Sequence, residues 1–331
     1  MFQSKSGKNM FQVLEDFDRN CLISKSGISY LDFRKQLTPN YYLVWTHLLL
    51  GYISLISIVA ITVFMDLKFD SFVPILILIS GFLIGYVLHY ILAFFHEAAH
   101  YNLAKNKALS DRLANIFIGL LFGQEIKSYR LIHFPHHQYL GTPKDTERTY
   151  FEPLTVQFII ESLTGIKLFK LLLFRIKNLH SEKAYSTIKN KKKVNPQIIF
   201  GLLFNGCVVL GSAILGIWAL TGAWLIGMMI FMPLLTSIQQ VLEHRDEFAS
   251  RDIDYRKQPH GQTNRLFGDG LVASTFGSAG FNRHLLHHWE PQISYTRFKE
   301  LEDFLMDTQA ATIIIKHRTT YFQAFVRLFT I

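Results

Sequence analysis

The chain has 331 residues, of which 50% are hydrophobic and only 18% are charged, whereas an ordinary soluble domain carries about a quarter charged residues. Its 34 Lys and Arg against 25 Asp and Glu give a net charge of +9, yet long stretches contain no basic residue. This balance argues against a soluble enzyme and favours a membrane protein, and two distant cysteines, Cys21 and Cys207, argue against a small disulfide-stapled secreted fold.

The first predicted elements are two membrane-spanning helices. Residues 1–41 are polar and mixed in charge and do not resemble a removable signal peptide. Residues 42–65 then run for 24 residues without a formal charge, which as a helix of about 36 Å crosses a hydrocarbon core of about 30 Å. After a polar connection at 66–72, residues 73–95 again lack Lys, Arg, Asp and Glu. Residues 42–95 therefore predict a helical hairpin.

A third apolar tract, residues 198–240, is 43 residues long. As one helix it would measure about 65 Å, which is twice the thickness of a bilayer, so it must fold back on itself. Thr221 and Gly222 near its middle are the predicted turn. The tract then gives two spans, 198–220 and 223–240, and a second helical hairpin.

The segment between the hairpins, residues 96–197, contains two apolar stretches that are too short or too interrupted by charge to span. Residues 113–123 and 154–174 are predicted to be helices at the membrane surface. The basic run at 177–193 is predicted to be a solvated loop near anionic lipid headgroups, with a docking site for an acidic protein as the alternative.

The distribution of basic residues predicts the orientation. Of the 34 Lys and Arg, only Lys68 lies in the loop between the first two spans, and none lies inside a span. By the positive-inside rule both termini are cytosolic, together with residues 96–197 and 241–331. The sequence thus predicts a single all-α integral membrane domain over residues 1–331. Four transmembrane helices form two hairpins, and a cytosolic helical cap carries the histidines.

Histidines gather in three short segments: HEAAH at residues 96–100, HFPHH at 133–137 and HLLHH at 284–288. Spacings of three and four residues place side chains on one face of a helix, and Pro135 predicts that the helix of the second segment opens there. A further histidine, His244, ends the fourth span. Folding back of the third apolar tract brings all of them to the same side of the membrane. The nine are His96, His100, His133, His136, His137, His244, His284, His287 and His288.

Nine neutral imidazoles predict a transition-metal site, because imidazole suits iron, copper, zinc and nickel but not calcium or magnesium. Nine ligands are too many for one ion. At four or five per ion they fit two, and a nitrogen-rich pair of irons can activate dioxygen near a lipid chain. Carboxylates should hold the second ring nitrogens, and the nearest candidates are Glu97, Asp145, Glu147, Glu243 and Asp246.

The remaining histidines are predicted to have other environments. His47 and His89 lie inside spans, and His89, which shares a helical face with His96, is expected to be a hydrogen-bonded interior residue rather than a ligand. His180, His260 and His317 are expected to be ordinary solvated side chains.

At these motifs the chain resembles the membrane fatty acid desaturase superfamily, including its acyl-lipid, sphingolipid and carotenoid branches. The resemblance covers roughly residues 94–304 and rests on HEAAH, on RLIHFPHHQYLGTPKDTE at 130–147 and on FNRHLLHHWEPQISYTR at 281–297. It implies an iron pair that removes hydrogen from an unactivated methylene and leaves a double bond, with dioxygen as co-substrate and two external electrons. The eight histidines of the three segments are then iron ligands.

Two features refine this resemblance. His244 matches a further ligand of the stearoyl-type members, and Gln240, one helical turn earlier, stands where those members have a water-bridging Asn and is the candidate for a water-mediated role. The first segment has three residues between its histidines, as in acyl-lipid members, which points to a lipid-linked substrate.

The sequence also bears on partners. It contains neither a haem-binding His-Pro-Gly-Gly stretch nor an iron–sulfur cysteine set. Electrons are therefore expected from a separate protein, a b-type cytochrome or a ferredoxin-like donor, which docks on the cytosolic face. The other expected partners are the membrane and a lipid or acyl-chain substrate, and no nucleic acid is expected.

Three alternatives stay open at this point. A hydroxylase or ketolase of a lipid or carotenoid would use the same histidines. An intramembrane zinc protease would use HEAAH with Glu97 as its base, but this leaves the six histidines of the other two segments unexplained. A metal transporter would need ligands inside the membrane rather than at its edge.

Overall fold

The computed structural model describes residues 14–69, 72–166, 170 and 196–329. Regular structure in these ranges is helical, apart from two isolated β-bridges that join Ile23 to Ser29 and Leu266 to Arg318. Four helices in these ranges are long and apolar enough to cross a membrane. The chain is an all-α integral membrane protein.

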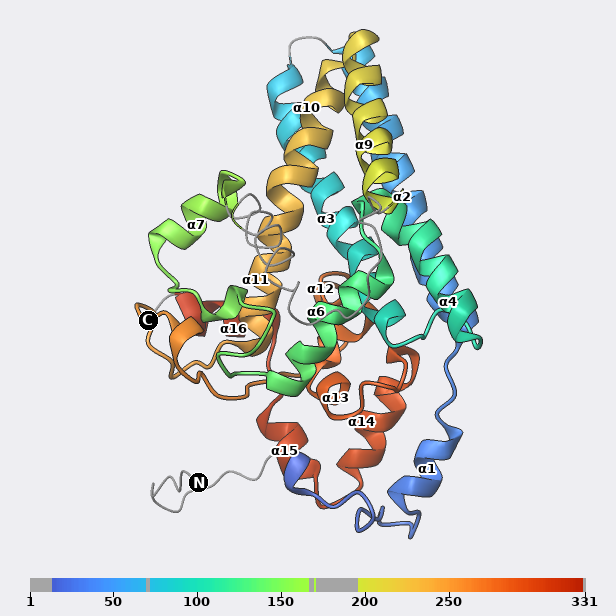
Figure 1. Cartoon of the computed structure of the whole chain (residues 1–331), viewed down its shortest axis with the longest axis vertical. Coiled ribbons are helices and arrows are strands. Elements are labelled where there is room, and N and C mark those ends of the chain that lie inside the picture. The colour runs from blue at the N-terminus through green and yellow to red at the C-terminus, as the bar shows by residue number, and fades with distance from the viewer. Residues whose placement is uncertain (1–13, 70–71, 167–169, 171–195, 330–331) are drawn as a thin grey trace, which may run out of the picture.

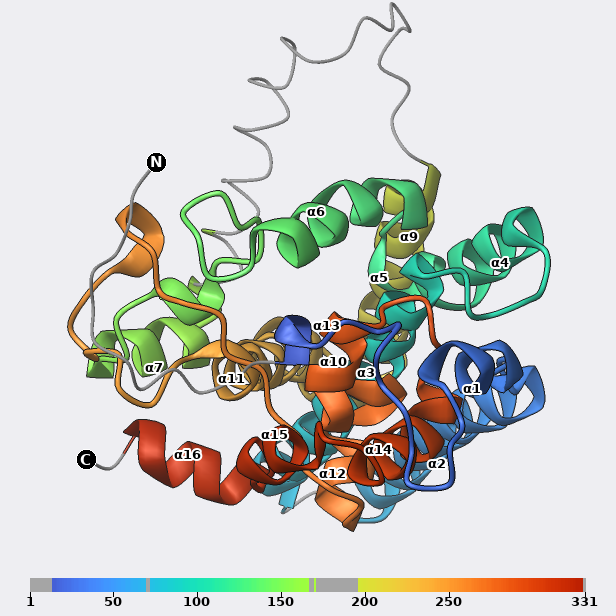
Figure 2. The ribbon, with the colours of Figure 1, turned by 90° about the horizontal axis from the view of Figure 1, so that it is seen from below.

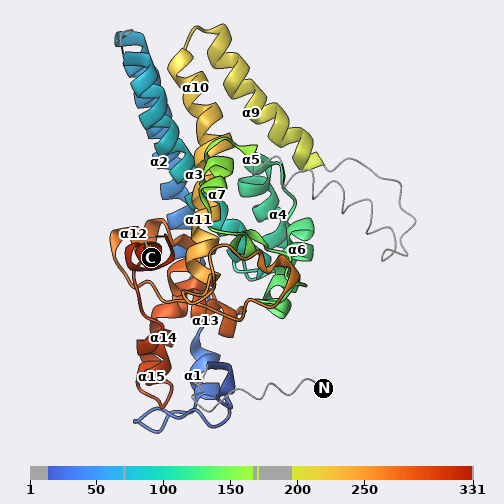
Figure 3. The ribbon, with the colours of Figure 1, turned by 90° about the vertical axis from the view of Figure 1, so that its left-hand side faces the viewer.

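The four long helices stand side by side above a cap of short helices (Figure 1). α2 (Tyr41–Lys68) packs along α3 (Val73–Ala99), and α9 (Pro196–Ile214) packs along α10 (Trp218–Ile226), as Figure 3 shows. α10 continues through the π-helical turn η6 (Gly227–Phe231) into α11 (Met232–His244). Exposed apolar side chains such as Ile56, Leu78 and Leu202 cover the outer faces of these helices, as expected for contact with lipid.

Small residues bring α3 and the α10–α11 helix into close contact. A Cβ added at Gly81 would lie 2.4 Å from Ile226, and one at Gly85 would lie 2.5 Å from Phe231. Apolar surface gains little from helix association in lipid, so close backbone approach at small residues is the usual means of holding such helices together. This contact fixes the ends of α3 and α11 relative to each other.

The predicted turn at Thr221 and Gly222 is wrong. Both residues lie inside α10, and the chain turns instead at Gly216, whose φ of 74° is left-handed. A Cβ at Gly222 would lie 2.8 Å from Ile77, so this glycine serves packing against α3 rather than reversal of the chain. Asp66, which was predicted to lie in the connection after the first span, is inside α2 and accepts a hydrogen bond of 2.9 Å from the backbone N–H of Ala219.

The cap gathers at one end of the long helices, with α13 near its centre when seen from below (Figure 2). A hydrophobic cluster with Leu22, Tyr30, Leu286 and Ile314 packs the N-terminal segment against the C-terminal helices. The cap elements are η1 (Leu14–Asp16), α1 (Tyr30–Gln36), α4 (Lys107–Ala114), η3 (Asn115–Gly119), α5 (Leu120–Phe122), α6 (Ile126–Tyr139), η4 (Thr149–Phe151), α7 (Val156–Leu163), η7 (Tyr255–Lys257), α12 (Leu271–Thr275), η8 (Ser278–Arg283), α13 (His284–Trp289), η9 (Tyr295–Arg297), α14 (Phe298–Met306), α15 (Ala311–Lys316) and α16 (Tyr321–Phe329).

The predicted surface segments are largely helical where the structure describes them. Residues 113–123 fall in the end of α4, in η3 and in α5, and residues 156–163 of the second segment form α7. The basic run at 177–193, with His180, lies outside the described residues.

Candidate metal centre

The structure brings the nine predicted histidines together in two groups. A five-histidine group contains His96, His100, His133, His137 and His287, and a four-histidine group contains His136, His244, His284 and His288. Within each group the candidate ligand atoms lie within 4.8 Å of one another. Both groups draw on α6 and α13, while the end of α3 supplies only the five-histidine group and the end of α11 only the four-histidine group.

The C-terminal end of α3 places His96 and His100. α3 runs to Ala99, beyond the predicted end of the span, so His96 lies in its last turn. Arg130 of α6 donates hydrogen bonds of 2.8 and 3.1 Å to the carbonyls of Ala99 and Ala98, and Asp111 pairs with its guanidinium at 2.5 Å. These bonds cap the C-terminal end of α3 and fasten α6 to it.

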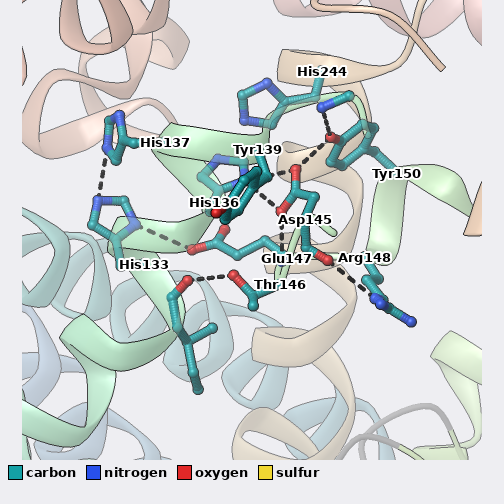
Figure 4. Close-up of polar contacts among 12 residues, drawn as sticks. His133, His136, His137, Tyr139, Asp145, Thr146, Glu147, Arg148, Tyr150 and His244 are labelled. Carbon is teal, nitrogen blue, oxygen red and sulfur yellow. Dashed lines mark hydrogen bonds and ion pairs between the residues drawn. The ribbon is translucent and has the colours of Figure 1, made fainter. Parts of the chain in front are cut away.

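Pro135 does not open the helix of the second segment, contrary to the prediction. α6 is continuous from Ile126 to Tyr139 with Pro135 inside it. Proline removes one backbone donor and crowds the preceding turn, and here Thr146 holds that turn because its hydroxyl donates to the carbonyl of Ile132 (Figure 4).

A tight turn in η8 directly precedes the third histidine segment, residues 284–288. Ala279 and Gly280 in η8 have left-handed φ angles of 52° and 92°. A Cβ at Gly280 would lie 2.6 Å from Tyr295, so only glycine fits there. Arg283, the residue before α13, is buried and pairs with Glu302 at 2.8 Å.

The Nε2 atoms of the histidines point inward, toward one another. In the five-histidine group His133 Nε2 lies 2.8 Å from His100 Nε2 and 3.0 Å from His137 Nε2. In the four-histidine group His284 Nε2 lies 3.0 Å from His244 Nε2 and 3.1 Å from His288 Nε2. Neither ring nitrogen of the buried His96 has a hydrogen-bond partner. Ring nitrogens that face one another this closely, with those of His96 left without a partner in the protein, suit binding of a shared cation.

The electrostatics of the site favour neutral imidazoles. Burial lowers the pKa of His133, His137, His284, His287 and His288 well below the ordinary value, and the neighbouring histidines lower it further. Burial, followed by the charge of Arg130, lowers the pKa of His100 to about 3. The neutral imidazole is the form that binds a metal, so the residues present fit the iron pair that the sequence predicts.

Carboxylates hold two of the outward nitrogens, as predicted. His136 Nδ1 lies 2.9 Å from Asp145 Oδ1, and His133 Nδ1 lies 3.1 Å from Glu147 Oε1 (Figure 4). Tyr150 donates a 2.6 Å hydrogen bond to the other oxygen of Asp145. Burial lowers the pKa of His136, but the charge of Glu147 and the contact with Asp145 outweigh burial, so this pKa is raised.

The predicted role is wrong for Glu97 and Asp246. Glu97 accepts hydrogen bonds of 2.7 Å from the Ser294 hydroxyl and 3.1 Å from the Tyr295 backbone, so it ties α3 to the loop after α13. Successive helix residues point about 100° apart, which directs Glu97 away from the ring of His96. The outward Nδ1 of His244 lies 3.1 Å from the Thr263 carbonyl, not near Asp246.

Gln240 has direct protein partners in place of the water expected at its position. Its Nε2 donates a 2.8 Å hydrogen bond to Glu147 Oε2, and its Oε1 accepts a 2.9 Å hydrogen bond from the Thr149 backbone. Gln240 therefore supports the carboxylate that holds His133. Sequence reasoning missed this contact, and also the Thr263 carbonyl, because neither has a signature in a linear motif.

The other histidines that the structure describes fall outside both groups. His89 contacts the Thr236 hydroxyl and the Phe276 carbonyl at 3.2 Å, which confirms it as a hydrogen-bonded residue. His47 contacts the Tyr295 hydroxyl at 2.9 Å. His260 and His317 are half-buried rather than solvated, and burial lowers the pKa of each to about 4.

Comparison with known proteins identifies a matching family. The family model described as "Fatty acid desaturase" matches residues 72–320, which include all nine histidines. No curated protein and no solved structure matches the chain.

Proposed function

The chain belongs to the fatty acid desaturase family, and we propose that it is a membrane-bound di-iron oxidoreductase that uses dioxygen and external electrons to desaturate an acyl chain of a lipid. The observation that carries this proposal is the convergence of nine histidine side chains in a five-histidine and a four-histidine group at one end of four apolar helices.

The donor set supports two irons. Imidazole nitrogens suit iron, and each group offers as many donors as one ion takes. When bound, the irons supply the oxidising chemistry that removes hydrogen from an unactivated methylene. The protein keeps the imidazoles neutral by burial, and Asp145 and Glu147 fix the orientation of two rings through their outward nitrogens.

The whole chain is proposed to act as one unit over residues 1–331. Neither group can form from one half of the sequence, since each combines histidines of the first or second segment with histidines beyond residue 240. The concentration of Lys and Arg outside the spans supports a cytosolic location for the site and both termini. In this arrangement a separate b-type cytochrome or ferredoxin-like protein delivers electrons from the cytosol, and the substrate chain enters from the bilayer.

The contacts of Glu97 argue against the zinc-protease alternative. A general base needs a carboxylate that can reach a metal-bound water, whereas one oxygen of Glu97 is occupied by Ser294 and Tyr295 and the side chain is fully buried. The five-histidine group that includes His96 also exceeds the donor set of a catalytic zinc, which keeps three protein ligands and an open position.

The test compares total lipid extracts from cells that express the wild-type chain or a His136→Ala, His287→Ala double variant, each with a compatible electron donor. The expected result is a lipid lighter by two hydrogens, made only by the wild type. A lipid heavier by one oxygen would instead identify a hydroxylase.

Iron analysis and membrane insertion complete this test. The double variant removes one ligand from each group, so it should lose iron while it still inserts in the membrane. Full product formation by the double variant would refute the assignment of the site, and a purified wild type that holds zinc and no iron would refute the di-iron proposal.

A further inference from the structure

The segment between α3 and α6 contacts the long helices well inside their apolar part. It consists of α4, η3 and α5, and α5 lies farther up the long helices than α4 (Figure 3). Asn205, at the midpoint of α9, donates a 2.9 Å hydrogen bond to the carbonyl of Leu121 in α5. Tyr52, inside α2, donates a hydrogen bond to the carbonyl of Phe117 in η3. The sequence predicts a position at the membrane surface for residues 113–123, and these contacts point deeper.

The length of α9 gives the depth. α9 has 19 residues and measures about 28 Å, which is close to the hydrocarbon core of about 30 Å. Its midpoint therefore lies near the middle of the bilayer, and the Leu121 carbonyl reaches toward that level. Arg112 precedes Leu121 by nine residues, or about 13 Å along a helix. Arg112 thus lies near the boundary of the hydrocarbon core on the side of the cap.

The turn after α5 has its polar backbone groups satisfied within the protein. The N–H of Gln124 donates a 2.9 Å hydrogen bond to the carbonyl of Gly119, and the N–H of Ile126 donates one of 2.9 Å to the side chain of Asn115. Gly123, at the tip, touches Gly201 of α9 so closely that a Cβ at Gly201 would lie 2.5 Å from it. Irregular backbone is tolerated at membrane depth only when its polar groups are satisfied in this way.

The segment has one packed face and one exposed face. The packed face belongs to the hydrophobic core and contains Ala114, Ile118 and Leu121. The exposed face contains Leu109, Arg112 and Ile116, which are spaced by three and four residues and so share one side of a helix. Lys105, just before the first turn, is also exposed. Apolar exposure therefore extends to the tip of this face, and its cations lie toward the base.

The two cations at the base have no carboxylate partner in the described part of the chain. Asp111, the acidic residue beside Arg112, pairs with Arg130 of α6 at 2.5 Å instead. Neither Lys105 nor Arg112 forms an ion pair within the described ranges. Exposed cations at the level of the lipid headgroups attract anionic lipids, and their long apolar stems allow the charge to reach the interface.

We propose that α4, η3 and α5 form a re-entrant element, which enters the bilayer leaflet nearest the cap and returns through α6, and that Lys105 and Arg112 at its base bind the phosphate of an anionic lipid headgroup. Arg130 pairs with Asp111 of this element and also bonds the carbonyls of Ala98 and Ala99. The element therefore fixes the height of the metal centre relative to the membrane surface. The proposal depends on neither the metal nor the activity.

The first test measures depth in the full-length protein reconstituted in liposomes. A nitroxide label is placed at Leu109→Cys or Ile116→Cys, in a background that carries Cys21→Ser and Cys207→Ser. Both labelled positions are exposed, at 47% and 56%, and lie on the same face about two turns apart. Collision with dissolved oxygen, which concentrates in lipid, is compared with collision with a water-soluble nickel chelate.

A re-entrant element should give a difference between the two positions. The label at position 116 should collide mainly with oxygen, and the label at position 109 should be more accessible to the nickel chelate. A helix that lies flat on the surface would give both labels the same depth, and a helix in water would expose both to nickel. Either of these results would overturn the proposal.

The second test measures binding of phosphatidylglycerol and of phosphatidylcholine to the detergent-purified protein by native mass spectrometry. The double variant Lys105→Gln, Arg112→Gln is compared with Lys25→Gln, Lys35→Gln. The control removes the same charge from exposed lysines of the N-terminal segment, at the end of the cap away from the long helices (Figure 1).

The wild type should prefer phosphatidylglycerol. Lys105→Gln, Arg112→Gln should lower the affinity for this lipid by about fivefold for each charge removed, without a change in the affinity for phosphatidylcholine. The control should bind phosphatidylglycerol as the wild type does. Unchanged affinity in the first variant, or an equal loss in the control, would overturn the assignment of Lys105 and Arg112 as the headgroup site.

Discussion

Asp145 and Glu147 lie two residues apart, but they contact histidines of different groups. Asp145 contacts His136 of the four-histidine group, and Glu147 contacts His133 of the five-histidine group. Loss of the Asp145 carboxylate should therefore mainly weaken metal binding by the four-histidine group. Loss of the Glu147 carboxylate should mainly weaken metal binding by the five-histidine group.

The magnitude follows from the contacts that each change removes. Asp145 is fully buried, and its oxygens accept hydrogen bonds from Tyr150 at 2.6 Å and the Glu147 backbone at 2.8 Å in addition to the His136 contact. Outer partners of metal ligands are worth about 10 to 100-fold in metal affinity, or about 1.4 to 2.7 kcal/mol. Asp145→Asn keeps the shape and an acceptor and should fall near the lower figure. Asp145→Ala leaves buried donors unpaired and should fall near the upper one.

The assay is anaerobic Fe(II) titration with site-resolved Mössbauer spectra. Asp145→Ala should lower the affinity of one iron and Glu147→Ala that of the other, so the two variants should affect different spectral signals. The reasoning would be refuted if both variants affected the same signal, or if Asp145→Ala bound both irons as tightly as the wild type.

Three further predictions concern the support of Glu147 by Gln240, the backbone conformation at Gly280 and the protonation of His136. Gln240→Glu should lower the affinity of the five-histidine group for iron more than Gln240→Ala, because the new carboxylate would repel the carboxylate of Glu147. Equal titration curves for the two variants would contradict this. Gly280→Val should lower the free energy of unfolding of the detergent-purified protein by about 1 to 3 kcal/mol in thermal denaturation, because Gly280 has a left-handed φ and close neighbours. Gly211→Ala should change this free energy far less, because no atom lies near the added carbon. At pH 6, metal binding should release about one proton, because the pKa of His136 is raised and its imidazole must lose a proton to bind. Calorimetry in buffers of different ionisation enthalpy measures this number. Release of several protons, as expected for nine histidines with the ordinary pKa of about 6.5, would contradict the prediction.

Local sequence rules were sufficient to predict the four long helices and the set of nine histidines. Three uncharged apolar tracts, the third long enough to cross the membrane twice, predicted the four long helices, since the cost of burying charge in a membrane depends on the segment itself. Spacings of three and four residues selected the eight histidines of the three segments, and the end of the fourth span added His244. Asp145 and Glu147 were found for a similar reason, because a short loop returns them to the helix that carries His133 and His136.

Only the tertiary structure decided how these side chains are shared. His136 and His137 are adjacent in sequence but belong to different groups, as do His287 and His288. The turn at Gly216 and the contacts of Glu97 also differ from the sequence-based expectation. The physical reason is that neighbouring side chains on a helix point about 100° apart. Which metal group each one faces therefore depends on how α3, α6, α11 and α13 pack against one another, and no local pattern encodes that packing.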